Sequence, residues 1–114
     1  MLAGAAERAD RRADIQAILI RYHDAVRRHP QLTLAIFAAP EAFAGVTRQI
    51  TDRLTALLAE LTTEPGLWRD ILVDHAHGSG LSLLQPPGDP AQAETLQEQY
   101  RQALDRLLDR LVIE

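Results

Sequence analysis

The sequence contains no cysteine, which excludes disulfide bonds, thiolate catalysis and zinc sites built on cysteine. It also contains no lysine, so that all 12 basic residues are arginine, and only 4% of its residues are aromatic. No apolar run approaches the roughly 20 residues that a membrane-spanning helix needs. The apolar start of the chain is interrupted by Glu7 and Arg8, too early for a signal peptide. We therefore expect a soluble, cytoplasmic protein that has no membrane partner.

The composition that remains is typical of a single helical domain. The 114 residues are 46% hydrophobic and 25% charged, which are the proportions of a globular protein. Leu, Ala, Arg, Glu and Gln are abundant, and these residues lose little side-chain freedom in a helix. The net charge of -4 argues against nucleic-acid binding by this chain alone. We predict one all-α domain over residues 1–114, an antiparallel bundle of about five helices.

Hydrophobic periodicity and the positions of proline and glycine place these helices. We expect helices over residues 12–28, 31–38, 41–61, 67–84 and 91–112, preceded by a short lead-in over residues 1–11. Pro30 and Pro40 end the first two helices, and residues 62–66 and 85–90 form loops. The apolar stripe of the first helix is Ile15, Ile18, Leu19, Tyr22 and Val26.

The expected helix over residues 67–84 is apolar around most of its circumference. At about 100° per residue, one face carries Trp68, Ile71, Leu72, His75, Ser79 and Ser82. Only a narrow strip, which includes His77, is clearly polar. A helix with so wide an apolar arc is usually covered from two sides. Gly78, Ser79 and Gly80 would allow another helix to approach closely.

The last expected helix carries a long apolar seam that resembles a coiled coil. Asp105 and Asp109 lie one turn apart and would repel each other, which suggests that an arginine from a neighbouring element lies between them. The last two helices together present more apolar surface than one chain can cover, and two-fold pairing is the commonest solution. We predict a homodimer whose interface contains Leu81, Leu96, Tyr100, Leu104, Leu107 and Leu111.

The histidines and serines do not form a recognisable catalytic or metal site. His75 and His77 lie about 200° apart on a helix, so they cannot both coordinate one metal ion. His23 and His29 are similarly misaligned. His75 and Ser79 have the spacing of a base and a nucleophile, but no strand-turn-helix elbow surrounds Ser79. We expect core or solvated histidines, no metal, no cofactor and no enzymatic activity.

Three stretches of the chain resemble the C-terminal domain of the TetR family of bacterial transcription regulators. Residues 18–30 (ILIRYHDAVRRHP) look like the family's helix that ends in a His-Pro corner. Residues 72–81 (LVDHAHGSGL) are similar to its penultimate helix, and residues 100–108 (YRQALDRLL) to its final amphipathic helix. The resemblance extends over roughly residues 12–112.

The resemblance implies a domain that binds a small molecule and dimerises through its last two helices. The family's DNA-binding head needs roughly 45 residues in three helices, whereas about eleven residues precede the first expected helix. DNA binding is therefore not implied for this chain. It is a fragment, the product of a mis-started reading frame, or a paralogue without the head, and the sequence leaves these three possibilities open.

A ligand site of this kind is a mostly apolar pocket between helices with a few polar groups. The candidate ligand-binding residues are Tyr22, Phe37, Phe43, Trp68, Leu72 and His75. For each aromatic residue, ordinary core packing is the alternative. We expect an effector-binding and dimerisation domain that takes a small, largely apolar molecule. The alternative is a helical interaction module that dimerises with itself or with a full-length regulator without binding a ligand.

Overall fold

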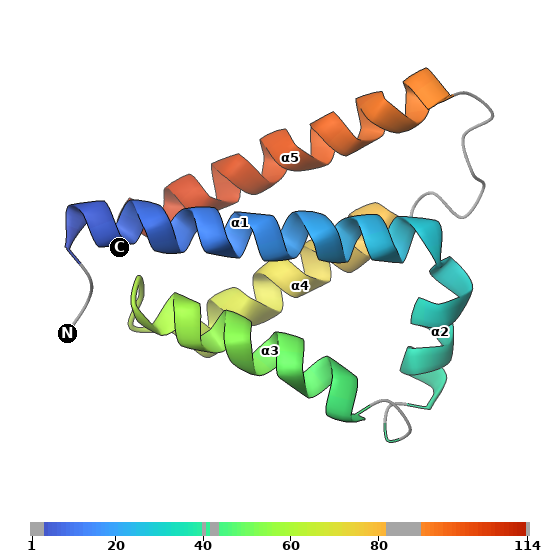
Figure 1. Cartoon of the computed structure of the whole chain (residues 1–114), viewed down its shortest axis with the longest axis horizontal. Coiled ribbons are helices and arrows are strands. Elements are labelled where there is room, and N and C mark those ends of the chain that lie inside the picture. The colour runs from blue at the N-terminus through green and yellow to red at the C-terminus, as the bar shows by residue number, and fades with distance from the viewer. Residues whose placement is uncertain (1–3, 40, 42–43, 82–89, 114) are drawn as a thin grey trace.

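The computed structural model describes residues 4–39, 41, 44–81 and 90–113, which form helices and no strand (Figure 1). The helices are α1 (Ala5–Arg28), α2 (Pro30–Ala38), α3 (Ala44–Ala59), α4 (Pro65–Leu81) and α5 (Pro90–Ile113). The predicted all-α class with five helices is thus confirmed for the described part of the chain. None of the described helices is long and apolar enough to cross a membrane.

Helix α1 begins earlier than the sequence pattern predicts. It starts at Ala5 rather than at residue 12, so the expected lead-in over residues 1–11 is wrong from Ala5 onward. The first turns are mostly charged and carry no apolar stripe, which is why periodicity missed them. Contacts with other helices stabilise these turns. Arg8 Nη2 donates a hydrogen bond to the carbonyl oxygen of Leu61, 3.3 Å away, in the turn that follows α3.

A corner at His29 and Pro30 joins α1 to α2. Pro30 occupies the first turn of α2, where its missing N–H would have no partner within the helix. The backbone N–H of His29 still bonds to the carbonyl of Ala25 at 2.9 Å and closes α1. The Thr33 hydroxyl donates to the carbonyl oxygen of His29 at 3.4 Å. The chain therefore turns sharply at the predicted position, and α2 projects across the end of the bundle (Figure 1).

Helix α1 is the centre of the bundle and contacts each of the other helices, α4 most extensively. It runs antiparallel to α3 and α5 and in the same direction as α4 (Figure 1). The predicted antiparallel arrangement therefore holds for α3 and α5, whereas α4 lies parallel to α1. Helices α1 and α3 lie close together near the start of α1 and diverge toward α2 (Figure 1).

The core lies where α1, α3, α4 and α5 meet. Its buried members are Ile15, Leu19, Leu54, Leu57, Leu58, Leu61, Leu72, Ala76, Tyr100, Leu104, Leu108 and Leu111. Three residues that we expected at a dimer interface are among them: Tyr100 is 2% exposed, and Leu104 and Leu111 are 0% exposed. The prediction is wrong for these three, because the α5 seam packs against the helices of its own chain. Leu81, Leu96 and Leu107 are only half-buried.

Arg12 fastens the N-terminal half of α1 to the C-terminal half of α5. Its Nη1 lies 2.7 Å from Asp109 Oδ1, and its Nη2 lies 2.6 Å from Asp105 Oδ1. Nη2 also donates to the backbone carbonyl of Asp105 at 3.0 Å. This confirms the expectation that an arginine from a neighbouring element lies between the two aspartates.

Candidate functional site

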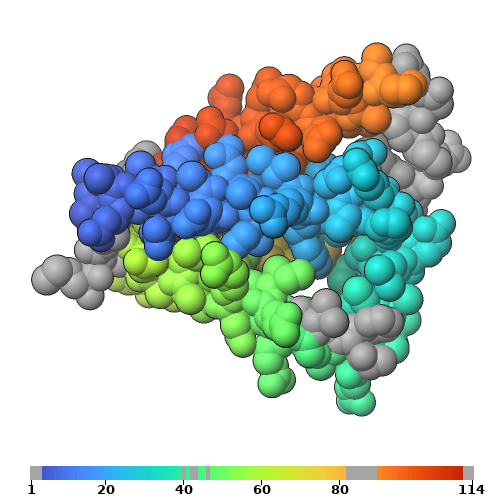
Figure 2. Space-filling model, viewed as in Figure 1, coloured from blue at the N-terminus to red at the C-terminus, as the bar shows by residue number. Residues whose placement is uncertain are grey.

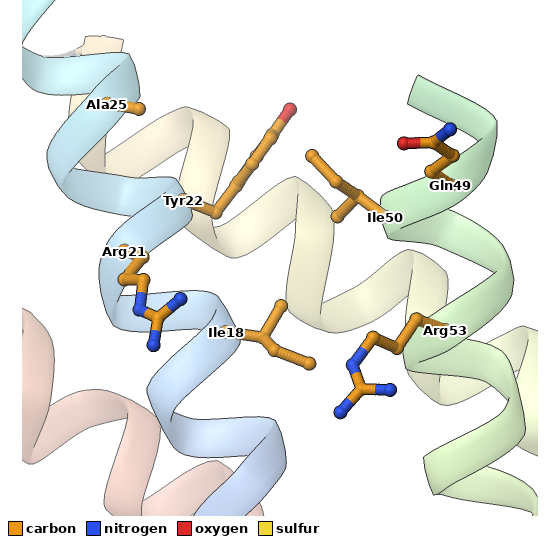
Figure 3. Close-up of a pocket in the computed structure, with 7 residues that line it drawn as sticks. All are labelled: Ile18, Arg21, Tyr22, Ala25, Gln49, Ile50 and Arg53. Atoms are coloured by element: carbon orange, nitrogen blue, oxygen red, sulfur yellow. The ribbon is translucent and has the colours of Figure 1, made fainter. Parts of the chain in front are cut away.

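A cleft of about 410 Å³ opens between α1 and α3 (Figures 2 and 3). Its described lining residues are Ile18, Arg21, Tyr22 and Ala25 from α1, and Gln49, Ile50 and Arg53 from α3. Within each helix these positions are mostly three or four residues apart, so one face of each helix forms a wall of the cleft. The volume falls within the range of about 300–1,000 Å³ that is common for small-molecule sites.

The cleft exists because only the C-terminal half of α3 enters the core. Leu54, Leu57 and Leu58 are buried there, whereas Gln49 is exposed and Ile50 is half-buried. On the opposite helix, Ile15 and Leu19 point into the core, while Ile18 and Tyr22 lie at its edge. Because α1 and α3 diverge beyond these contacts, their facing side chains do not close the space between them.

The walls of the cleft are apolar in the middle and positively charged at one end. Ile18, Ile50 and the ring of Tyr22 supply apolar surface. In Figure 3 the guanidinium groups of Arg21 and Arg53 lie on either side of Ile18, while the Tyr22 hydroxyl points toward the opposite end. None of the described lining residues is acidic.

A hydrogen bond connects this wall to α4. The Tyr22 hydroxyl is bonded to Nε2 of His77, and their ring centroids are 5.2 Å apart. Phe37 of α2 meets the His77 ring edge-on, with centroids 4.9 Å apart and planes at 87°. Burial raises the pKa of Tyr22 and lowers the pKa of His77, although Asp74 opposes the second shift. Both groups are therefore neutral near pH 7. Together with Phe37, they join α1, α2 and α4.

His23 is a polar group inside the core. It is 1% exposed, and its ring stacks on Tyr100 with centroids 3.7 Å apart and planes at 2°. His75 also stacks on Tyr100, at 5.3 Å and 17°. Burial lowers the pKa of His23 to about 4, and the charge of Arg27 acts in the same direction. The ring is therefore neutral at pH 7 and packs as an aromatic core residue.

Ser79 lies against His23 rather than against His75. His23 Nε2 and Ser79 Oγ are 3.1 Å apart, which is the distance between a base and a nucleophile. However, the other ring nitrogen of His23, Nδ1, is buried and has no hydrogen-bond partner among the described residues. No carboxylate of the described residues bonds to this nitrogen, and a group with a pKa of about 4 is a weak base at neutral pH. The pair fits a packing contact between α1 and α4.

The structure brings together only part of the predicted ligand site. Tyr22 lines the cleft, and Phe37, whose side chain is about half exposed, reaches Tyr22 through His77. Phe43 lies outside the described residues.

Three other candidates are placed elsewhere. Leu72 is completely buried in the core, and Trp68 packs against the core. His75 lines a second, shallower groove of about 370 Å³ between α4 and α5, beside Leu107 and Arg106. None of these three is among the described residues that line the cleft. Leu72 and Trp68 lie on the side of α4 that packs in the core, and His75 lies on the side toward α5.

Sequence reasoning missed most of the residues that line the cleft. Ile18 was placed in the apolar stripe of the first helix, and His77, which contacts Tyr22 of the cleft, was placed in a polar strip. One signal was present. Arg21 follows Ile18 by three residues, and Arg53 follows Ile50 by three. The same spacing on two helices places a guanidinium group about one turn from a cleft isoleucine on each wall.

Comparison with known proteins gives no relative: no family model, no curated protein and no solved structure matches the chain. Among the described residues, no three histidine or carboxylate side chains lie close enough to hold a metal ion. The function must therefore be argued from the chemistry of the cleft and the exposed surfaces.

Proposed function

We propose that this chain is the effector-binding and dimerisation domain of a TetR-type transcription regulator, and that the cleft between α1 and α3 binds a small, largely apolar molecule. The observation that carries this proposal is the cleft itself, with Ile18, Ile50 and Tyr22 on facing walls. The order of five helices is compatible with the resemblance of residues 18–30, 72–81 and 100–108 to that family.

The apolar walls provide enough energy for weak but measurable binding. Each buried methylene contributes about 0.8 kcal/mol. An eight-carbon chain therefore gains about 6 kcal/mol before the costs of association are met. Polar groups at the two ends of the cleft would orient such a molecule. This division between apolar contact area and a few polar groups is typical of small-molecule sites.

The contacts of Tyr22 support a route from the cleft to the rest of the molecule. A ligand that packs against the Tyr22 ring alters the position of its hydroxyl, and this hydroxyl is bonded to His77 of α4. Helix α4 also contributes to the proposed dimer surface. Occupation of the cleft would therefore favour one arrangement of α4 over another, which is what an effector must do.

The proposed dimer surface is the outer face of α4 together with the adjoining edge of α5. At about 100° per residue, Leu67, Ile71 and Gly78 share one face of α4. Leu67 is 54% exposed and Ile71 is 38% exposed. Leu96 and Leu107, both half-buried, lie on one edge of α5. We propose that these residues, rather than the buried Tyr100, Leu104 and Leu111 of α5, form the contact between two copies of the chain.

Sedimentation velocity tests this surface. We expect Ile71→Glu to convert a dimer into a folded monomer, because Ile71 is outside the core. Leu34→Glu introduces the same charge at an exposed leucine of α2 and should leave the dimer intact. A wild-type chain that sediments as a monomer at micromolar concentration would remove the dimerisation part of the proposal.

Filling the cleft tests ligand binding. N-phenyl-1-naphthylamine, a neutral dye that fluoresces in apolar sites, should bind the wild-type chain saturably. Ala25→Phe places a ring inside the cleft and should abolish this signal, whereas Ala17→Phe, on an exposed position of α1 outside the cleft lining, should not. Equal dye binding by both variants would show that the apolar site is not this cleft.

A second candidate function is the interaction module that binds no ligand. The observation that favours it is the surface of α2, where Leu32, Leu34 and Phe37 are each about half exposed. Exposed apolar patches of this kind often mark protein contacts. Saturable dye binding that Ala25→Phe abolishes favours the sensing domain. Stable self-association without any saturable apolar site favours the module.

A further inference from the structure

Two arginines line the cleft together with its apolar side chains. We propose that its ligand carries a carboxylate, and that Arg21 and Arg53 hold this group while the apolar part lies along Ile18, Ile50 and Tyr22. This inference rests on the proposed ligand-binding function and narrows it from an apolar molecule to an apolar acid.

The two arginines are placed on opposite walls. Arg21 belongs to α1 and Arg53 to α3, and both guanidinium groups lie toward the same end of the cleft (Figure 3). A guanidinium group is planar, is always charged, and donates two parallel hydrogen bonds to a carboxylate. A carboxylate that lies between the two guanidinium groups would contact both walls at this end of the cleft.

Within the described part of the chain, neither arginine has an ion-pair partner, although the chain as a whole has a net charge of -4. The nearby acidic side chain of α1 is already engaged: Asp24 lies 2.7 Å from Arg27 and 3.0 Å from Arg28. The cleft is thus a local region of positive charge on an acidic chain, and charge of one sign lining a cleft attracts ligands of the opposite sign.

The apolar lining distinguishes this site from an ordinary solvated arginine. Arg48, on the same helix as Arg53, is exposed as Arg21 and Arg53 are, but it does not line the cleft. Arg53 projects beside Ile50 and faces Ile18 across the space (Figure 3). An acid with an apolar tail would satisfy both features at once, whereas a neutral or cationic amphiphile would leave the two guanidinium groups without a partner or repel them.

Isothermal titration calorimetry on the full chain tests the proposal with three probes that share one tail. These are octanoate and octylammonium, each below its micellar concentration, and octan-1-ol below its solubility limit. Octanoate should bind at least about tenfold more tightly than octan-1-ol, because hydrogen bonds to a charged group contribute about 1.5–3 kcal/mol. Octylammonium should bind most weakly. Only the affinity for octanoate should fall as salt is added.

Charge-removing variants assign the effect to the two arginines. Arg21→Gln and Arg53→Gln should each weaken octanoate binding about tenfold and leave the affinity for octan-1-ol unchanged. Arg48→Gln removes the same charge from the surface of α3 and should change neither affinity.

The outcomes separate this inference from the proposed function. Equal affinities for octanoate and octan-1-ol would overturn the carboxylate preference while an apolar site remains. The same holds if neither Arg21→Gln nor Arg53→Gln lowers the affinity for octanoate. If Arg48→Gln lowers the affinity for octanoate as much as the cleft variants do, the effect is one of net charge and the proposal is also overturned. If no probe binds, the proposed ligand-binding function fails as well.

Discussion

Gly80 of α4 lies so close to Val26 of α1 that a Cβ atom on Gly80 would stand 2.6 Å from Val26 Cγ1 and 3.0 Å from Val26 Cβ. Both residues are buried. Gly78, by contrast, would have no atom within 4 Å of an added Cβ. The sequence-based expectation of a close helix approach at Gly78, Ser79 and Gly80 therefore holds for Gly80 and not for Gly78.

Gly80→Ala should destabilise the chain by about 1–3 kcal/mol, because the stiff side chain of Val26 cannot move aside without strain. Urea denaturation measures the change. Gly78→Ala is the matched control in the same helix, and it should be neutral or stabilising by up to about 1 kcal/mol through helix propensity. Equal stability of the two variants would contradict the packing of α4 on α1.

The contacts of Arg12 with Asp105 and Asp109 predict a salt-dependent contribution to stability. Arg12→Gln should lower the free energy of unfolding by about 1 kcal/mol at low salt, because one guanidinium group joins two carboxylates. The loss should shrink at 1 M salt, where the screening length is about 3 Å. Arg101→Gln, at an exposed position of the same α5 helix, should have little effect at either ionic strength. A loss that does not depend on salt would show that Arg12 acts through packing alone.

Burial of His23 predicts loss of stability in mild acid. The pKa of His23 is about 4 in the folded chain, below the ordinary value of 6.5 that it regains on unfolding. The unfolded chain therefore binds more protons between these values, and stability falls as the pH drops from 6.5 toward 4. For His23 alone, the loss by pH 5 is about 2 kcal/mol relative to neutral pH. The lowered pKa values of His75 and His77 act in the same direction.

His23→Gln should flatten the dependence of unfolding free energy on pH between 6.5 and 4, even though the variant is less stable at pH 7. His29→Gln removes an exposed histidine and serves as the matched control for the loss of one imidazole. Chemical denaturation at a series of pH values gives these slopes. An unchanged slope in His23→Gln would mean that His23 is not protonated on unfolding.

The fold class and the helix positions follow from local features of the sequence. Proline positions and apolar spacing gave the corner at Pro30 and the extent of α5 to within a residue or two. The start of α1 was missed because its first turns carry no apolar stripe and Arg8 acts through a partner far along the chain. Such partners have no periodicity that a local pattern can detect.

The candidate site was less predictable, because a cleft depends on how two helices diverge. Periodicity placed Tyr22 on the inner face of α1. It could not show that Leu72 lies in the core or that His77 forms a hydrogen bond with Tyr22. It also assigned Leu104 to a dimer surface, since an apolar seam looks the same whether its partner is the same chain or another. Tertiary placement, rather than residue type, decides each of these cases.

Isoleucine δ1-methyl NMR during an octanoate titration tests the central claim most directly, because isoleucines sample the cleft, the core and the outer surface. The account predicts saturable shifts for Ile18 and Ile50, which line the cleft, and no change for Ile71 on the outer face of α4. Shifts that are confined to Ile71, or the absence of any saturable shift at Ile18 and Ile50, would contradict the claim that this cleft is the ligand site.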